Sequence, residues 1–159
     1  MRVAVTKEIN PDFQSKHIMS ALEKMPPQAG YTCSHILFIH DDSIYHCTGR
    51  GVTKDSLSEF LKTHVIVKEK EIKFFNGNLD QFIGFNEALI EMNVDYSEGQ
   101  FVGFLFPHLE KYVKDGRSEL VCSEYAGWTG AKYFGSKYKE DYDFLDPIES
   151  FEGFPCLDL

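Results

Sequence analysis

The segment ELVCSEYAGW, residues 119–128, places Cys122 where an extended run meets a stretch that can open a helix. A free thiol has a pKa of about 8.5, so only a small fraction of it is thiolate at neutral pH. The unpaired N–H groups of a helix N-terminus stabilise both a thiolate and a developing oxyanion. We therefore expect Cys122 to have a lowered pKa and to be the nucleophile of an acyl-transfer site.

Two histidines, His35 and His46, occupy a predicted hairpin in the segment SHILFIHDDSIYHCT. Side chains alternate faces along a strand, so a two-residue loop at Asp41 and Asp42 would put both histidines on one face as a diagonal pair, roughly 7–8 Å apart. A three-residue loop would substitute Cys47 for His46. In the first register, the long side chains of His35 and His46 are within reach of each other.

The elements that must carry these residues follow from hydrophobic periodicity. Strands are predicted at RVAVTK and HVIVKEKEIKFF, and helices at SKHIMSALEKM, KDSLSEFL and Leu79–Met92. The apolar segment GQFVGFLFPHLEKYV should pack with Leu79–Met92 over one face of the sheet, and the Gly- and Pro-punctuated tail after the Cys122 helix should be irregular. We predict one α+β domain over residues 1–159, with a small antiparallel sheet packed against helices.

Composition narrows the possible partners. The 16 Lys and Arg against 25 Asp and Glu give a net charge of −9, which disfavours nucleic acid. No run approaches the roughly 18 apolar residues of a membrane span, and MRVAVTKEINPDF lacks the apolar middle of a signal peptide. We therefore expect a protein that is cytoplasmic or delivered by another route. The oligomeric state leaves no signature in the sequence.

The segments SHILFIHDDSIYHCTGRGV, VDYSEGQFVGFL and LVCSEYAGW, in this order, resemble the permuted papain-like amidases, which are circularly permuted relatives of the NlpC-type cysteine peptidases. In that family the strand histidine precedes the cysteine, which opens a helix at Cys-Ser-Glu. The resemblance implies that His35 is the base, His46 the orienting residue and Cys122 the nucleophile. It also implies a permuted NlpC-type papain-like fold.

The same resemblance compares Tyr96 with a tyrosine that precedes the segment leading to the cysteine helix, and Gly51-Val52 with the turn after the hairpin. It implies a cysteine-dependent amidase or peptidase that acts on cell-wall peptide or on other amide, isopeptide or acyl substrates, with Tyr96 as a substrate-binding residue. We expect no cofactor and no metal. Because His46 stands where many relatives have a glutamate, the alternative is a catalytically inactive binding or interaction module on the same scaffold.

Two rival sites use the same residues. Cys33 would share a strand face with His35, although a thiol in mid-strand lacks the helix N-terminus that lowers a pKa. Cys and His are also zinc ligands, so Cys33, His35, His46 and Cys122 could form a metal site, although their spacing matches no zinc-finger pattern. His64 has no partner that the sequence reveals.

Overall fold

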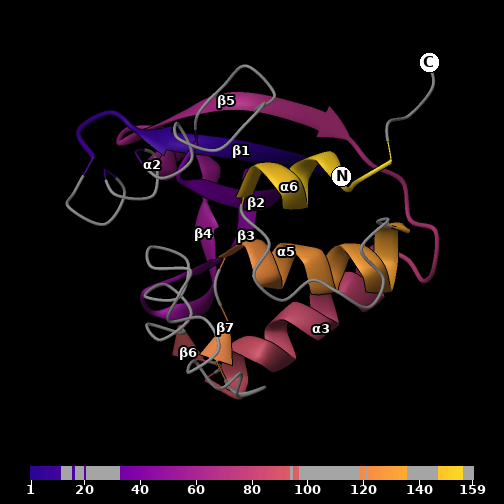
Figure 1. Ribbon diagram of the computed structural model, residues 1–159. Helices are drawn as coiled ribbons and strands as arrows, with labels where there is room; N and C mark the ends of the chain where they lie inside the picture. Colours follow the sequence, from indigo (N-terminus) through magenta and orange to yellow (C-terminus); the bar gives the residue numbers. More distant parts are fainter. Residues whose placement is uncertain are drawn as a thin grey trace, which may run out of the picture.

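The computed structural model describes residues 1–11, 16, 20, 33–93, 95–96, 119–120, 122–135 and 147–155 (Figure 1). The helix predicted at SKHIMSALEKM, apart from Lys16 and Ser20, lies outside these residues. The apolar segment GQFVGFLFPHLEKYV lies wholly outside them.

A five-stranded antiparallel sheet organises the described residues, and it confirms the predicted α+β class. Its order is β4-β3-β2-β1-β5, with bounds β1 Arg2–Glu8, β2 His35–His40, β3 Ser43–Thr48, β4 Gly51–Ser56 and β5 His64–Glu71. The β2–β3 hairpin pairs His40 with Ser43 across a loop of Asp41 and Asp42, and Asp41 has a positive φ of 51°. The two-residue register predicted for this hairpin is therefore confirmed.

Beyond the hairpin, one prediction is wrong and another is confirmed only in part. Gly51 and Val52 begin β4 and are not a turn, because β4 pairs with β3 over its whole length. The helix predicted at KDSLSEFL is limited to α2, Leu57–Phe60, since Ser56 ends β4 and its side chain accepts a hydrogen bond from the N–H of Glu59. A serine at this N-cap position satisfies an N–H that the first turn of the helix leaves unpaired.

Most of the described helical residues pack on one side of the sheet (Figure 1). They form α3 Leu79–Glu91, α5 Cys122–Thr129, its π-helical continuation η2 Gly130–Phe134, and α6 Pro147–Glu152. The tail was predicted to be irregular, but α6 is helical there, since Ile148 and Phe151 are buried against the sheet. None of the helices in the described ranges combines the length and apolar character that a bilayer crossing requires.

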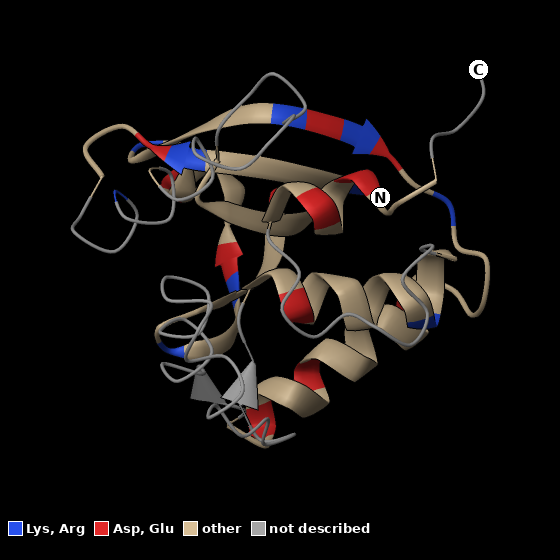
Figure 2. Ribbon diagram, viewed as in Figure 1, with Lys and Arg blue, Asp and Glu red and all other residues tan. Residues whose placement is uncertain are grey.

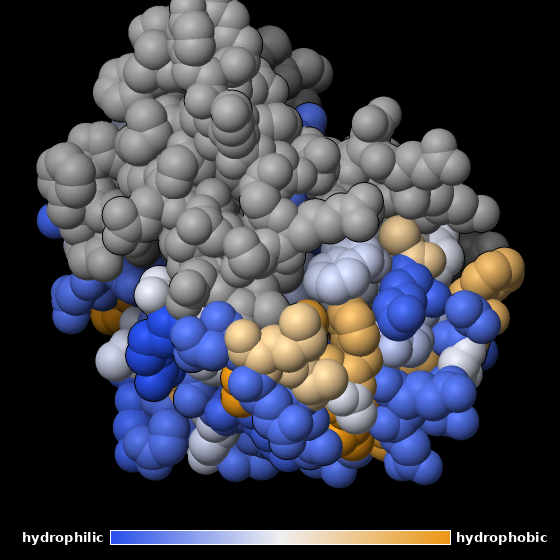
Figure 3. Space-filling view, turned by 90° about the horizontal axis from the view of Figure 1, so that it is seen from below, coloured by the Kyte–Doolittle hydropathy of each residue, from blue (hydrophilic) through white to orange (hydrophobic). Residues whose placement is uncertain are grey.

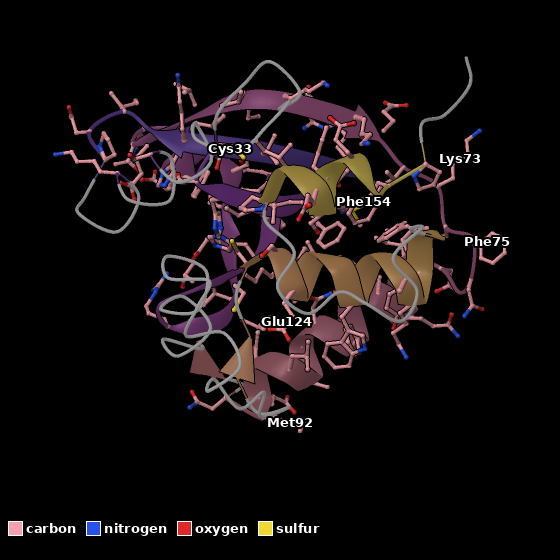
Figure 4. All side chains as sticks on the ribbon, in the orientation of Figure 1. Cys33, Lys73, Phe75, Met92, Glu124 and Phe154 are labelled. Atoms are coloured by element: carbon pink, nitrogen blue, oxygen red, sulfur yellow. The ribbon has the colours of Figure 1, made fainter. Side chains whose placement is uncertain are left out.

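The strand alternation divides the core into two clusters. The larger cluster lies between the sheet and α3, α5 and α6, and at its centre the ring of Phe38 contacts the rings of Phe82, Tyr125, Phe134 and Phe154 at centroid distances of 5.5–5.8 Å. Figure 4 shows Phe154 between α6 and α5. The smaller cluster lies on the opposite face under α2, with buried residues Ala4, Leu37, Ile39 and Ile44.

The edge strand β5 carries alternating charges, which Figure 2 shows as neighbouring blue and red segments. Two ion pairs link β5 to β1 and α6: Arg2 to Glu69 at 2.8 Å and Lys68 to Glu152 at 3.2 Å. Charged side chains discourage a second chain from pairing with an exposed strand. On the face of the molecule in Figure 3, seen from the side of α3, the described residues are mostly hydrophilic, with smaller apolar areas between them.

A short parallel pair leads into the cysteine helix. The strands are β6 Asp95–Tyr96 and β7 Glu119–Leu120, and Tyr96 pairs with Leu120. Leu120 precedes the first residue of α5 by two positions. This pairing therefore places the backbone of Tyr96 close to the start of α5.

Candidate active site

Three side chains from adjacent strands form a continuous hydrogen-bonded relay. His35 Nε2 lies 2.8 Å from His46 Nδ1, and His46 Nε2 lies 2.9 Å from Asp55 Oδ2. His35 begins β2, His46 lies within β3 and Asp55 lies near the end of β4. The sheet therefore brings together the two histidines that the sequence predicted, and it adds a carboxylate.

Strand pairing explains why these side chains meet. The β2–β3 register puts His35 and His46 on one face, and the β3–β4 register pairs His46 with Thr53 and Ile44 with Asp55. Residues two apart in a strand share a face, so Asp55 projects on the same side as Thr53. Sequence reasoning missed Asp55 because it assigned this residue to a helix. The alternation of β4 beyond Thr53 is the signal that would have found it.

An aromatic ring covers the relay from α2. The ring centroid of Phe60 lies 6.3 Å from that of His35 and 5.6 Å from that of His46, and the ring stacks on His64 at 3.9 Å. His64 in turn lies 3.7 Å from a carboxylate oxygen of Glu8. The sequence revealed no partner for His64, whereas the structure places it beside Phe60 at the edge of the histidine pair.

Burial keeps both relay histidines neutral at neutral pH. The pKa of His35 is well below its ordinary value, because desolvation disfavours the imidazolium and repulsion from His46 and His64 in their protonated forms lowers it further. The pKa of His46 is lowered mainly by desolvation, although the hydrogen bond and charge of Asp55 act in the opposite direction. A neutral His35 retains a basic lone pair, which a general base requires.

The carboxylate of Asp55 remains ionised at the outer end of the relay. Its Oδ2 also accepts hydrogen bonds from Arg50 Nη2 at 3.1 Å and from Thr53 Oγ1 at 3.3 Å. Partial burial alone would raise the pKa of Asp55, but the hydrogen bond and charge of His46, together with Arg50, lower it overall. Asp55 can therefore only accept hydrogen bonds at neutral pH.

Cys122 is the first residue of α5, as the sequence predicted, and its side chain packs in the larger core cluster with 5% of the residue exposed. Burial raises the pKa of the Cys122 thiol to about 11, although backbone hydrogen bonds at Ile36, Ser123 and Cys122 itself lower it. The donors of these three hydrogen bonds are backbone N–H groups, because a backbone carbonyl has no proton to donate to the sulfur. The expected lowering of this pKa is wrong, because desolvation outweighs the helix N-terminus.

The thiol and the relay approach the start of β2 from opposite faces of the sheet. The sulfur of Cys122 lies against the amide of Ile36, the residue that follows His35 in β2. Within the part of the chain that the structure describes, no hydrogen bond joins this sulfur to the His35 ring. His35 Nε2 is engaged by His46, so the ring nitrogen that remains for the thiol is Nδ1.

The rival cysteine sites receive no support from these positions. Cys33 is buried in the larger cluster with Ile36, on the face opposite His35, so the predicted shared face is wrong. Cys47 also lies on that face, near enough to Cys122 that a negative charge on the Cys122 sulfur raises the pKa of the Cys47 thiol. Among the described residues, no group of three or more His, Cys, Asp or Glu side chains is arranged to hold a metal ion.

Comparison with protein-family models, with curated proteins and with solved structures gave no match to this chain. The functional argument therefore depends on the site residues themselves.

Proposed function

We propose that this protein is a cysteine-dependent amidase or peptidase that transfers an acyl group from a peptide-like amide or ester to Cys122 and then to water. The observation that supports this proposal is the relay of His35, His46 and Asp55, together with a cysteine at a helix N-terminus whose sulfur lies against the amide of Ile36, the residue after His35. Acyl transfer requires a thiol, an imidazole oriented by a second polar group, and N–H donors for an oxyanion, and the described residues include each of these.

The reaction would begin from a neutral thiol and a neutral imidazole. The Cys122 sulfur attacks the carbonyl carbon as its proton passes to His35, and the carbonyl oxygen becomes an oxyanion. The N–H groups of Cys122 and Ser123, which already surround the sulfur, are the candidate donors to that oxyanion. Proton return from His35 to the leaving amine or alcohol then produces a Cys122 thioester, and water activated by the same base hydrolyses it.

A neutral resting pair fits the electrostatics of the site better than a preformed thiolate–imidazolium pair. Burial raises the pKa of Cys122 and lowers that of His35, so charge separation is costly before a substrate arrives. The proton would therefore move only as the carbon–sulfur bond forms. Catalytic hydrogen bonds that are absent in an unliganded site commonly tighten when substrate binds, which is the geometry this mechanism requires between Cys122 and His35.

The second candidate function is an inactive binding or interaction module on the same scaffold. One observation favours it: Cys122 is 5% exposed and its thiol is strongly biased towards the protonated form. In that case His35, His46 and Asp55 would stabilise the three strands without taking part in chemistry.

Tyr96 remains a proposed substrate-binding residue, on the strength of its backbone pairing beside the start of α5.

Hydrolysis of a p-nitrophenyl ester and of a peptide anilide tests the two candidates. If the protein is an enzyme, it should hydrolyse these substrates, and Cys122→Ala should reduce the rate by about 10³-fold or more. Cys33→Ala is the matched control, since it removes a buried thiol from the same cluster, and it should retain activity. Equal residual rates in Cys122→Ala and the unmodified protein would contradict the proposal and favour the binding module.

A further inference from the structure

We infer that Asp55, held by Arg50 and Thr53, is a positioning residue that fixes the tautomers of both relay histidines and leaves Nδ1 of His35 as the basic nitrogen. The catalytic meaning of this inference rests on the proposed acyl transfer. The tautomers themselves follow from the hydrogen bonds and are measured without any assay of activity.

The assignment starts at the carboxylate. Three donors converge on Oδ2 of Asp55, from His46 at 2.9 Å, Arg50 at 3.1 Å and Thr53 at 3.3 Å. An ionised carboxylate has no proton to donate, so the atom of His46 that faces it must carry one. His46 is therefore protonated on Nε2.

The protonation of His35 then follows from that of His46. A neutral imidazole carries one proton, so Nδ1 of His46 is a bare acceptor. The contact of 2.8 Å between this atom and His35 Nε2 is a hydrogen bond only when His35 donates. His35 is consequently protonated on Nε2, and its lone pair lies on Nδ1.

Burial and the surrounding groups keep His46 neutral. The groups that face His46 are His35 from β2, Asp55 from β4, Arg50 from the β3–β4 turn and His64 from β5, with the uncharged Phe60 over its ring. Arg50 and His64 disfavour a second proton on His46, while Asp55 favours it, and burial decides the balance. Only 2% of His46 is exposed, so the desolvation cost of an imidazolium there is large.

The same arrangement would stabilise the proton that acyl transfer delivers. When the Cys122 thiol gives its proton to Nδ1 of His35, the ring becomes an imidazolium whose Nε2–H still points at the lone pair of His46. Asp55 accepts the one proton of neutral His46, on Nε2, and this keeps the lone pair on Nδ1, where it faces His35. Without the carboxylate, His46 can reverse its tautomer, and its Nδ1–H would then oppose the Nε2–H of His35.

Nitrogen-15 chemical shifts of the imidazole rings at neutral pH test the inference, with His35→Gln and His46→Gln used for assignment. In the unmodified protein, both histidines should carry their proton on Nε2. Asp55→Asn should give mixed tautomers at His46 and His35. Asp41→Asn makes the same chemical change in the exposed hairpin loop and should leave both patterns intact.

A proton on Nδ1 of either histidine in the unmodified protein would overturn the inference, whatever Asp55→Asn does to the fold. Unchanged tautomers in a folded Asp55→Asn protein would overturn it as well. On a cleaved ester substrate, Asp55→Asn should lower kcat by about 10²–10⁴-fold with little change in KM, while Asp41→Asn should not. The proposed function alone fails if the tautomers are as inferred but Cys122→Ala leaves turnover unchanged.

Discussion

The sulfur of Cys122 lies against the backbone amide of Ile36, one residue beyond His35. This relationship joins the first turn of α5 to the first residues of β2, two segments that are far apart in the chain. It places a thiol next to the strand that carries the proposed base, and it also buries that thiol. The reactivity of Cys122 consequently depends on which of these two effects is larger.

Burial should make Cys122 slow to alkylate. With a thiol pKa of about 11, its thiolate fraction at neutral pH is about 10²-fold or more below that of a free cysteine. We expect iodoacetamide to modify Cys122 in the folded protein at least about 10²-fold more slowly than in urea, with a rate that still rises above pH 9. Peptide mass spectrometry locates the modified residue. A labelling midpoint at or below pH 8.5 would show instead that the helix N-terminus prevails.

The neutral state of His35 should make the fold sensitive to acid. Because its pKa in the folded protein lies below the unfolded value of about 6.5, the unfolded chain takes up a proton that the folded chain does not, and stability falls as pH drops below 6.5 towards the folded pKa. The free energy of unfolding, measured in urea between pH 7 and pH 5, should fall less steeply in His35→Gln. His40→Gln, at the other end of β2, is the control and should keep the slope of the unmodified protein. Equal slopes for all three proteins would contradict the assignment.

The stability of the larger core cluster should depend strongly on Phe38. This fully buried ring contacts four other aromatic rings and links β2 to α3, α5 and α6. Phe38→Ala should lower the free energy of unfolding by about 3–5 kcal/mol, as measured by urea denaturation. Phe75, which is 78% exposed and points away from the core in Figure 4, supplies the control. The account of the core is wrong if Phe38→Ala costs no more than Phe75→Ala.

Local sequence patterns were sufficient to predict the hairpin geometry. The Asp41-Asp42 loop and the strict alternation on either side of it predict that His35 and His46 share a face, and the structure has this register. These signals are local, because loop length and the two-residue period act within a dozen residues. The helix start at Cys122 was predictable for the same reason.

Features that depend on tertiary contacts were not predictable in this way. The segment KDSLSEFL suggests a short helix that would include Asp55, yet pairing with β3 holds Lys54, Asp55 and Ser56 in a strand. The pKa of Cys122 was expected to fall because the helix N-terminus is visible in the sequence, whereas its burial against the sheet is not. Local patterns identify the side chains of the candidate site, but their protonation states come from packing.

The central claim, that His35 activates Cys122 for acyl transfer, is tested most directly by trapping the acyl-enzyme. The protein is mixed with p-nitrophenyl acetate at pH 7, quenched in acid, and the acetylated residue is located by peptide mass spectrometry. The account predicts acetylation at Cys122 that is lost in His35→Ala and retained in His40→Ala, even though iodoacetamide scarcely modifies the same thiol. Acetylation that spares Cys122, or that proceeds equally in His35→Ala, would contradict it.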